Sequence, residues 1–370
     1  MKAETENAVH SYPILDRIGR RWDLQQPFAG KKTAIVGHIT PILEQLAKNL
    51  FKGGGDWALI EVNPKTTDDQ VLSRLSREPI EILRHIPTGR DLLAMNLDLA
   101  MDVGGGLLKS LADAHRSSSS FQGGVEITTA GSKSLASLEL PFGVYDVSQS
   151  QLKKGIEARR GVGEGAWIAF TRLTSRGVSG RRVTVMGFGA VGEGVAEYAR
   201  ALGGCVTVVD PCPIRLLQAH YLGYSVLPRK QALSSAEVIV TAAGAGNVLS
   251  IADLRTCTDG VFLFNVSHDG RDLPIMELSR RESLRRTEHW EEYMLQDGRR
   301  IHLLGAGAPL NIATGSGSPE HVLIQFALAA RCLERLTVSL PPPGLHSPPR
   351  AMEEETAKLA LEALGREQFQ

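Results

Sequence analysis

The sequence predicts an α/β protein made of two α/β domains, one of which contains a doubly wound parallel sheet. Three observations support this prediction. The chain has 370 residues, enough for two domains of ordinary size. Apolar runs typical of strands alternate with segments typical of helices, the order expected of parallel sheets. The composition, 42% hydrophobic and 22% charged, is that of a globular protein.

The charge balance and the apolar pattern exclude several kinds of partner. Lys plus Arg and Asp plus Glu both number 41, so the formal net charge is zero and nothing indicates nucleic acid or an anionic membrane. No apolar run reaches the roughly 18 residues that a transmembrane helix needs, and the first residues lack the apolar core of a signal peptide. We therefore expect a cytoplasmic protein.

The cysteines give no sign of a disulfide framework or a zinc site. None falls in a C-x-x-C pair; the four are Cys205, Cys212, Cys257 and Cys332. We expect reduced thiols, as is usual in the cytoplasm, and no metal.

The first half of the chain has a β-α-β pattern. A helical segment at 41–52 lies between two apolar strands, and its spacing places Leu43, Leu46, Ala47 and Leu50 on one face. The predicted strands are 33–37, 57–62, 97–103, 124–128 and 143–147. No dinucleotide-binding motif occurs among them.

The second half alternates more regularly. A long helical stretch at 150–177 precedes the strands 183–186, 205–209, 237–241 and 261–266, with helices at 190–202 and 213–222. Residues 279–300 mix both signs of charge, which favours a solvated helix. The proline-rich segment 340–350 indicates an extended linker before a last amphipathic helix at 353–365.

A glycine-rich turn identifies the doubly wound sheet as Rossmann-type. The sequence GFGAVGEG at 187–194 follows a β-branched strand and opens a helix. Its glycines permit a tight turn and a close approach of backbone to a pyrophosphate, and the helix N-terminus faces the phosphates. We expect Gly187, Gly189, Ala190, Val191 and Gly192 to bind the cofactor.

The next strand ends in Asp210, about 20 residues after the turn, where a carboxylate can accept hydrogen bonds from ribose hydroxyls. Its charge would repel a 2′-phosphate, so the sequence predicts NAD rather than NADP. Arg215, five residues on, complicates this prediction but does not replace the acid.

Beyond the glycines, the chain resembles the S-adenosylhomocysteine hydrolases over residues 12–335. GRRVTVMGFGAVGEG, VVDPCPIRLLQAHYLGY, TAAGAG and FNVSH are similar to that family's nucleotide domain. GHIT at 37–40, NPKTTDDQV at 63–71 and GVGE at 161–164 are similar to its flanking motifs, as is GAPLNIATGSGSP at 307–319. The resemblance implies a discontinuous α/β substrate domain, residues 1–160 completed by 319–370, and an NAD-binding domain, residues 161–318.

The resemblance also implies a reaction cycle. The family uses NAD as a built-in oxidant that converts the ribose 3′-hydroxyl to a ketone and so acidifies the neighbouring C–H. The thiol is then eliminated, water adds, and the ketone is reduced back. The net reaction is hydrolysis of a thioether with NAD regenerated.

The residues around the hydroxyl to be oxidised are largely retained. Lys153 matches the family's lysine that handles the hydroxyl proton, and Glu157 stands where the family has aspartate. His38 matches a histidine near the elimination centre, and His268 matches one near the sugar diol. Without the resemblance, Lys153 and Glu157 at i, i+4 would be read as a surface ion pair.

The resemblance assigns further residues to the cofactor. They are Thr128 and Thr129, which contact cofactor and sugar, Asn311, which orients the nicotinamide carboxamide, and Ala243 and Asn265 in the nucleotide-domain motifs.

Two acid positions of the family are altered. A collinear match places Val103 and Ile127 where the family has acids that assist elimination. A shift of one residue would restore Asp102 or Glu126, so both stay candidate catalytic residues.

Other departures concern substrate and assembly. Ile42 and Leu43 replace the residues that read adenine, and an unpaired amino group there costs about 1–3 kcal/mol. Ser318 replaces a gate histidine, and the segment at 80–100 is short. The C-terminus lacks the lysine- and tyrosine-bearing tail that reaches a neighbouring protomer. We expect a homo-oligomer, a dimer or a tetramer.

Three functions follow from these features. The first is an NAD-dependent enzyme that oxidises a hydroxyl of a sugar- or nucleoside-like small molecule, with or without elimination and hydrolysis. The second is genuine S-adenosylhomocysteine hydrolysis. The third is an NAD-binding pseudoenzyme that acts through a protein partner.

Overall fold

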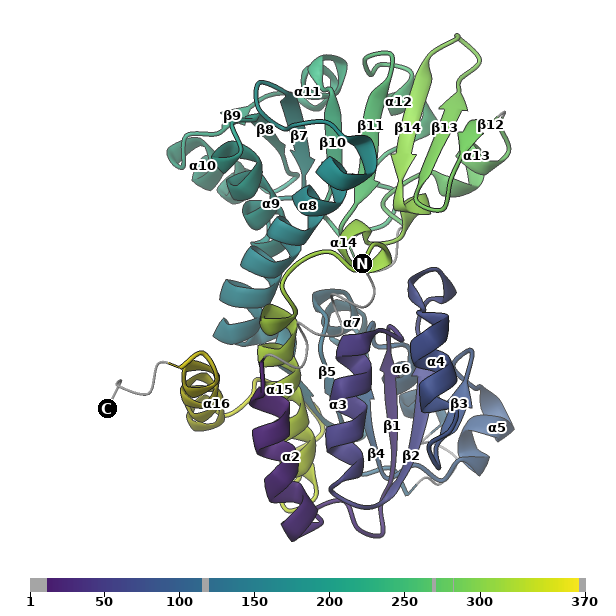
Figure 1. Ribbon diagram of the computed structural model, residues 1–370, viewed down its shortest axis with the longest axis vertical. Coiled ribbons are helices and arrows are strands. Elements are labelled where there is room, and N and C mark those ends of the chain that lie inside the picture. Colours follow the sequence, from purple (N-terminus) through teal and green to yellow (C-terminus); the bar gives the residue numbers. More distant parts are fainter. Residues whose placement is uncertain (1–11, 115–119, 268–270, 282, 366–370) are drawn as a thin grey trace. The chain divides into compact units, whose positions relative to one another are not determined.

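The structure is a computed structural model that describes residues 12–114, 120–267, 271–281 and 283–365. The chain divides into two compact units (Figure 1). Unit 1 comprises the chain up to Glu157 and from Pro319 onward, and unit 2 is Ala158–Ser318. Each unit has its own core and its own sheet, which is parallel throughout in unit 1 and mostly parallel in unit 2, so the predicted α/β fold class is confirmed.

Unit 1 is built on a seven-stranded sheet in which every pair is parallel. The strand order is β15-β6-β5-β4-β1-β2-β3. Along β4, Leu99 and Met101 enter one core cluster and Ala100 the other, as a strand covered on both faces requires. The strands are β1 Lys32–Gly37, β2 Asp56–Glu61, β3 Glu81–Leu83, β4 Leu99–Asp102, β5 Gly123–Glu126, β6 Gly143–Asp146 and β15 Gly344–His346.

The helices of unit 1 cover both faces of this sheet. Three of them, α2, α3 and α15, pack against one another, and α15 also packs against β4 and β5 (Figure 1). The helices are α2 Ile14–Gln25, α3 Pro41–Phe51, η1 Pro64–Thr66, α4 Asp69–Leu75, α5 Gly89–Ala94, α6 Gly106–Ala114, α7 Thr129–Leu135, η3 Val147–Gln149, α15 Pro319–Leu336 and α16 Arg350–Ala363.

The start of helix α3 shows how local sequence fixes the residues that follow β1. Thr40 caps it by accepting the N–H of Leu43 at 3.4 Å, and Pro41 occupies the first helical position, where no N–H is needed. Its predicted apolar face is buried. Only three residues, 38–40, therefore separate the end of β1 from the helix, which fixes their position.

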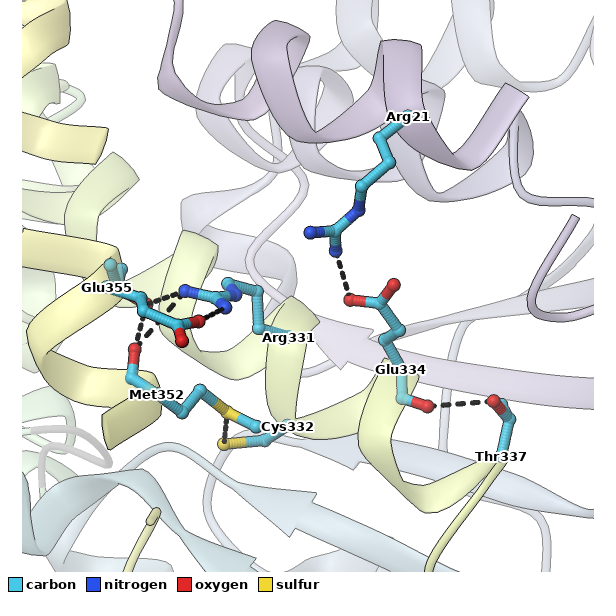
Figure 2. Close-up of polar contacts among 8 residues, drawn as sticks. Arg21, Arg331, Cys332, Glu334, Thr337, Met352 and Glu355 are labelled. Carbon is cyan, nitrogen blue, oxygen red and sulfur yellow. Dashed lines mark hydrogen bonds and ion pairs between the residues drawn. The ribbon is translucent and has the colours of Figure 1, made fainter. Parts of the chain in front are cut away.

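The last helices are fastened to unit 1 by buried polar contacts. In α15, the Arg331 guanidinium pairs with Glu355 of α16 (Figure 2). It also donates to the Thr356 hydroxyl at 3.1 Å. Tyr12 donates to the carbonyl of Ala360 at 3.0 Å. Since an arginine cannot shed its charge, its burial requires these partners.

The proline-rich segment is extended, as predicted, but it is more than a linker. Its residues Gly344–His346 form β15, which pairs in parallel with β6. The Gly344 N–H donates to the carbonyl of Phe142 at 3.0 Å. Proline is tolerated there because β15 is an edge strand.

Unit 2 contains an eight-stranded sheet in the order β12-β13-β14-β11-β10-β7-β8-β9. The chain builds outward from β7 in both directions, so the order reverses between β7 and β10, the position at which doubly wound sheets bind ligands. The strands are β7 Arg182–Met186, β8 Cys205–Val209, β9 Ser225–Val226, β10 Val238–Thr241, β11 Val261–Asn265, β12 Ser283–Arg286, β13 Trp290–Met294 and β14 Arg300–Leu304.

Helices connect the strands of unit 2. They are α8 Val162–Thr174, α9 Ala190–Ala201, α10 Pro213–Tyr221, α11 Arg229–Ser235, α12 Ile251–Leu254, α13 Ile275–Ser279, η5 Gly305–Gly307 and α14 Leu310–Ala313. The predicted helix at 150–177 is present as the π-helix η4, Lys153–Gly161, followed directly by α8. The boundary between the units falls inside η4.

The prediction of a solvated helix at 279–300 is wrong. Strands β12 and β13 lie within this segment and run antiparallel, with β13 paired to β14. Tyr293 is buried, and Arg286 pairs across the strands with Glu291 at 2.9 Å. Mixed charges suit an exposed sheet edge as well as a helix, because paired charges also face each other across strands.

Candidate functional site

The glycine turn after β7 is shaped by close backbone contacts. Gly187 adopts φ +100°, and a Cβ there would lie 2.9 Å from the carbonyl group of Ala242. A Cβ at Gly192 would lie 1.8 Å from the Gly187 carbonyl oxygen. A Cβ at Gly189, by contrast, would meet only Arg215 Nη1, at 3.9 Å. The turn is thus closed toward the protein and open at Gly189, where α9 begins.

Asp210 lies directly after β8 and holds this turn. Its Oδ2 accepts the N–H of Phe188 at 2.7 Å, and its Oδ1 accepts the N–H of Cys212 at 2.8 Å. Arg215 Nη1 lies 3.5 Å from Oδ2, and the Arg215 side chain is 47% exposed. The buried carboxylate of Asp210 therefore lies at the end of β8, and the exposed guanidinium of Arg215 partly offsets its charge.

The residues after β10 and β11 lie at the same carboxyl ends of the sheet of unit 2, on the other side of β7. Asn265 is buried, and its amide is used inside the protein: Oδ1 accepts from the Ser267 N–H at 2.9 Å, and Nδ2 donates to the Ser267 carbonyl at 2.6 Å. Ala243 is the second residue after β10. The Asn311 side-chain oxygen is buried and has no hydrogen-bond partner among the described residues. An acceptor of this kind, with the open glycine turn, fits a dinucleotide that ends in a carboxamide.

Lys153 and Glu157 form an ion pair in the π-helix η4. Each side chain is only 12% exposed. The neighbouring Lys154 differs, since it is exposed and bonds Gln149 at 2.8 Å. π-Helical turns are rare and occur often at functional sites.

His38 lies just beyond β1. Its Nδ1 is 2.6 Å from the Thr66 hydroxyl, which itself donates to the carbonyl of Asn63 at 2.7 Å. Because that hydroxyl proton is used, His38 Nδ1 must be the donor. The neutral imidazole then carries its lone pair on Nε2.

Asp102 and Glu126 are neighbours at the ends of β4 and β5. Asp102 Oδ2 accepts the Leu108 N–H at 2.9 Å, and Glu126 Oε1 accepts the Thr128 N–H at 2.7 Å. Burial raises the pKa of both carboxyls, and the charge of Asp102 raises the pKa of Glu126 further. Both acids are fully buried. The structure therefore brings these two candidates together as a pair that holds the following loops.

The residues after these acids are apolar. Val103 and Ile127 are buried in the main core cluster of unit 1. Thr128 caps α7: its hydroxyl donates to Glu126 and accepts the Gly131 N–H at 3.0 Å. Thr129 is exposed. His268 lies outside the described residues.

Sequence reasoning missed two further acids at this edge. Glu61 ends β2, accepts the Thr67 hydroxyl and pairs with Arg84 at 2.9 Å. Asp146 ends β6 and accepts the Ser148 N–H at 3.0 Å. An acid directly after a run of buried strand residues is the signal that could have found them.

The described residues contain neither a metal cluster nor a membrane-spanning helix. No group of three or more His, Cys, Asp and Glu side chains is placed to hold a metal ion. In the same part of the chain, every helix is too short or too polar to cross a bilayer.

A doubly wound sheet with this glycine turn and a crossover acid defines a class of enzymes that bind a nicotinamide dinucleotide. Residues 162–317 match the model of the S-adenosyl-L-homocysteine hydrolase NAD-binding domain. This match confirms NAD as the cofactor.

Curated relatives match along nearly the whole chain. An S-inosyl-L-homocysteine hydrolase from Methanosarcina mazei is 30% identical over 97% of this chain and 92% of its own length. An adenosylhomocysteinase from Pyrobaculum aerophilum is 29% identical over 95% of this chain and 89% of its own length. The chain belongs to the S-adenosylhomocysteine hydrolase family, and it is an NAD-dependent enzyme of that family.

Solved structures add support for the fold alone. A dipicolinate synthase chain from Bacillus halodurans superposes with a TM-score of 0.52 at 14% identity. The superposition covers 85% of this chain and 100% of the synthase chain.

Proposed function

We propose that unit 1 binds a sugar- or nucleoside-like small molecule, and that the enzyme oxidises one of its hydroxyl groups. The Lys153–Glu157 pair carries this proposal. A solvated pair at i, i+4 keeps its charges in water and contributes only a few tenths of a kcal/mol. With each side chain 12% exposed, this pair has lost most of its hydration, a cost that a functional role explains.

The chemistry of the step fits the groups present. Oxidation of a secondary alcohol removes a hydride from carbon and a proton from oxygen. NAD, when bound, is the hydride acceptor. The amine form of Lys153 Nζ accepts the hydroxyl proton, and the Glu157 carboxylate stabilises the ammonium group that forms. In a following elimination, the proton of the C–H acidified by the ketone could pass to His38 Nε2.

Hydrolysis of an S-nucleosyl-homocysteine is the second candidate, and the matches to the two relatives favour it. Leu43 packs inward, with Cδ1 3.0 Å from a Cβ placed on Gly37, and Ile42 is half-buried. Neither side chain can accept a hydrogen bond from the amino group of adenine. Because hypoxanthine lacks that group, an inosyl substrate avoids the cost of an unpaired donor.

A turnover experiment tests the proposal. The purified enzyme is incubated with adenosine, inosine and their S-homocysteine derivatives, while the NADH absorbance is followed and products are identified by mass spectrometry. We expect at least one of these compounds to reduce the bound cofactor. Free homocysteine among the products would select the hydrolase.

Lys153→Ala should lower turnover by about 10²–10⁴-fold, the usual contribution of a positioned base. Lys154→Ala is the matched control, because that neighbour is exposed, bonds Gln149 rather than Glu157, and should leave turnover unchanged. If no compound reduces the cofactor, the proposal is wrong and an NAD-binding protein without turnover remains. If both variants keep full activity, Lys153 is not the base and the proposal is wrong for that reason.

A further inference from the structure

Four consecutive backbone N–H groups in unit 2 converge on one buried carboxylate. They belong to the loop after β10, residues 243–246. Ala243 and Gly244 donate to Asp272 Oδ2 at 3.2 and 3.0 Å. Ala245 and Gly246 donate to Asp272 Oδ1 at 3.1 Å each.

The loop conformation makes this convergence possible. Gly244 and Gly246 adopt φ +56° and +71°, in the left-handed region that glycine tolerates. Successive N–H groups that point into one concavity form an anion-binding nest. In this protein, the nest holds the protein's own Asp272, which is fully buried, and so it is closed to a ligand phosphate.

The carboxylate is also tied to the neighbouring strand end. The Ser267 hydroxyl lies 2.9 Å from Asp272 Oδ2 and 2.6 Å from Asn265 Oδ1. Asn265 in turn accepts the Thr241 hydroxyl at 3.1 Å and bridges to Pro309, two residues before Asn311. Thus Asp272 connects the loop after β10, the end of β11 and the segment that leads to Asn311.

We propose that Asp272 is a positioning residue for NAD. It holds residues 243–246 in the shape that the cofactor site needs, and through Asn265 it fixes the approach to Asn311. These segments contain the three residues that the family resemblance assigns to the cofactor after β10 and β11, namely Ala243, Asn265 and Asn311. The effect is on NAD affinity and does not depend on which substrate the enzyme takes.

The charge and the two acceptor oxygens are both required. An asparagine at this position would keep one oxygen, but its NH₂ group would face two N–H donors. The loop would then relax to find other partners.

The test measures NAD affinity of the full-length chain by equilibrium dialysis, with thermal unfolding followed in parallel. Asp272→Asn should weaken NAD binding by at least tenfold. Asp146→Asn is the matched control, because Asp146 is also a buried acid that accepts a backbone N–H, in unit 1. It should lower the melting temperature without changing NAD affinity.

A purely structural role for Asp272 predicts a lower melting temperature with unchanged NAD affinity, and that result would overturn the proposal. If Asp272→Asn does not fold, Gly244→Ala replaces it. This change keeps the carboxylate and strains the loop at φ +56°, and it should also weaken NAD binding. Unchanged affinity in that variant overturns the proposal equally. Lys153→Ala should keep NAD affinity, so failure here and failure of the oxidation proposal are separable.

Discussion

The two units differ in the residues that stand at the carboxyl ends of their parallel strands. In unit 2, β7 runs into an open glycine turn, and Asp210 after β8 holds that turn in place. In unit 1, four strands end in acids, Glu61, Asp102, Glu126 and Asp146, and every one is buried. Each of these acids accepts a hydrogen bond from the segment that follows it or from a neighbouring loop.

The difference teaches how each unit uses the residues at its strand ends. In unit 2, the glycine turn lies within the residues that match the family's NAD-binding domain, and it stays open. In unit 1, the carboxylates at the strand ends accept hydrogen bonds from the protein's own loops. Val103 and Ile127 follow two of these acids and are buried in the core. Under the proposed function, substrate chemistry in unit 1 falls to side chains beyond the strand ends, such as His38 and Lys153.

The largest effect is expected from a substitution that closes the glycine turn and so removes what distinguishes unit 2 from unit 1. In Gly192→Ala, the new Cβ would lie 1.8 Å from the Gly187 carbonyl oxygen, so the backbone must move. We expect NAD affinity, measured by equilibrium dialysis, to fall at least about 100-fold, or about 2.7 kcal/mol. Gly155→Ala in η4 is the control, since no atom lies within 4 Å of its Cβ and affinity should not change. A Gly192→Ala enzyme that binds NAD normally would falsify the role given to this turn.

A second prediction concerns the acids of unit 1. The pKa of Glu126 is raised in the folded state, first by burial and then by Asp102. The folded state therefore keeps a proton that the unfolded state has lost. The resulting stability is fully present below the ordinary pKa of a carboxyl and is lost as the pH rises through the raised value.

Glu126→Gln resembles the protonated acid and should flatten this dependence. The slope for one proton is at most about 1.4 kcal/mol per pH unit. Urea unfolding of the wild type and the variant across this pH range measures the effect. Parallel pH profiles for the two proteins would show that Glu126 is ionised in the folded state after all.

The smallest expected effect is on cofactor selectivity in unit 2. Arg215 lies 3.5 Å from Asp210 and offsets the charge that repels a 2′-phosphate. Arg215→Ala should raise the preference for NAD over NADP by about two- to fivefold, the range for an exposed charge. Competition binding with both dinucleotides measures it, and Lys230→Ala, an exposed cation on α11, should have no effect. A weaker preference for NAD in Arg215→Ala would contradict the prediction.

How much the sequence could predict depends on how local each feature is. Some features depend only on residues close together in the sequence or on one crossover, so the sequence could predict them. These are the glycine turn, Asp210 and the i, i+4 pair Lys153–Glu157. The pairing of Asp102 with Glu126 depends on the register of two strands, and the nest around Asp272 depends on glycine φ angles and on contacts across 26–29 residues. The β12–β13 hairpin was missed because mixed charges carry no period.

The insertion of unit 2 within unit 1 sets an order for folding during synthesis. Unit 2 is continuous in sequence and can fold as soon as it is made, since domains fold as units. Unit 1 cannot, because α15, which fills its core with residues such as Leu323 and Leu328, and the edge strand β15 are translated last. The NAD-binding half is thus available to capture its cofactor while the other half still waits for its final helices.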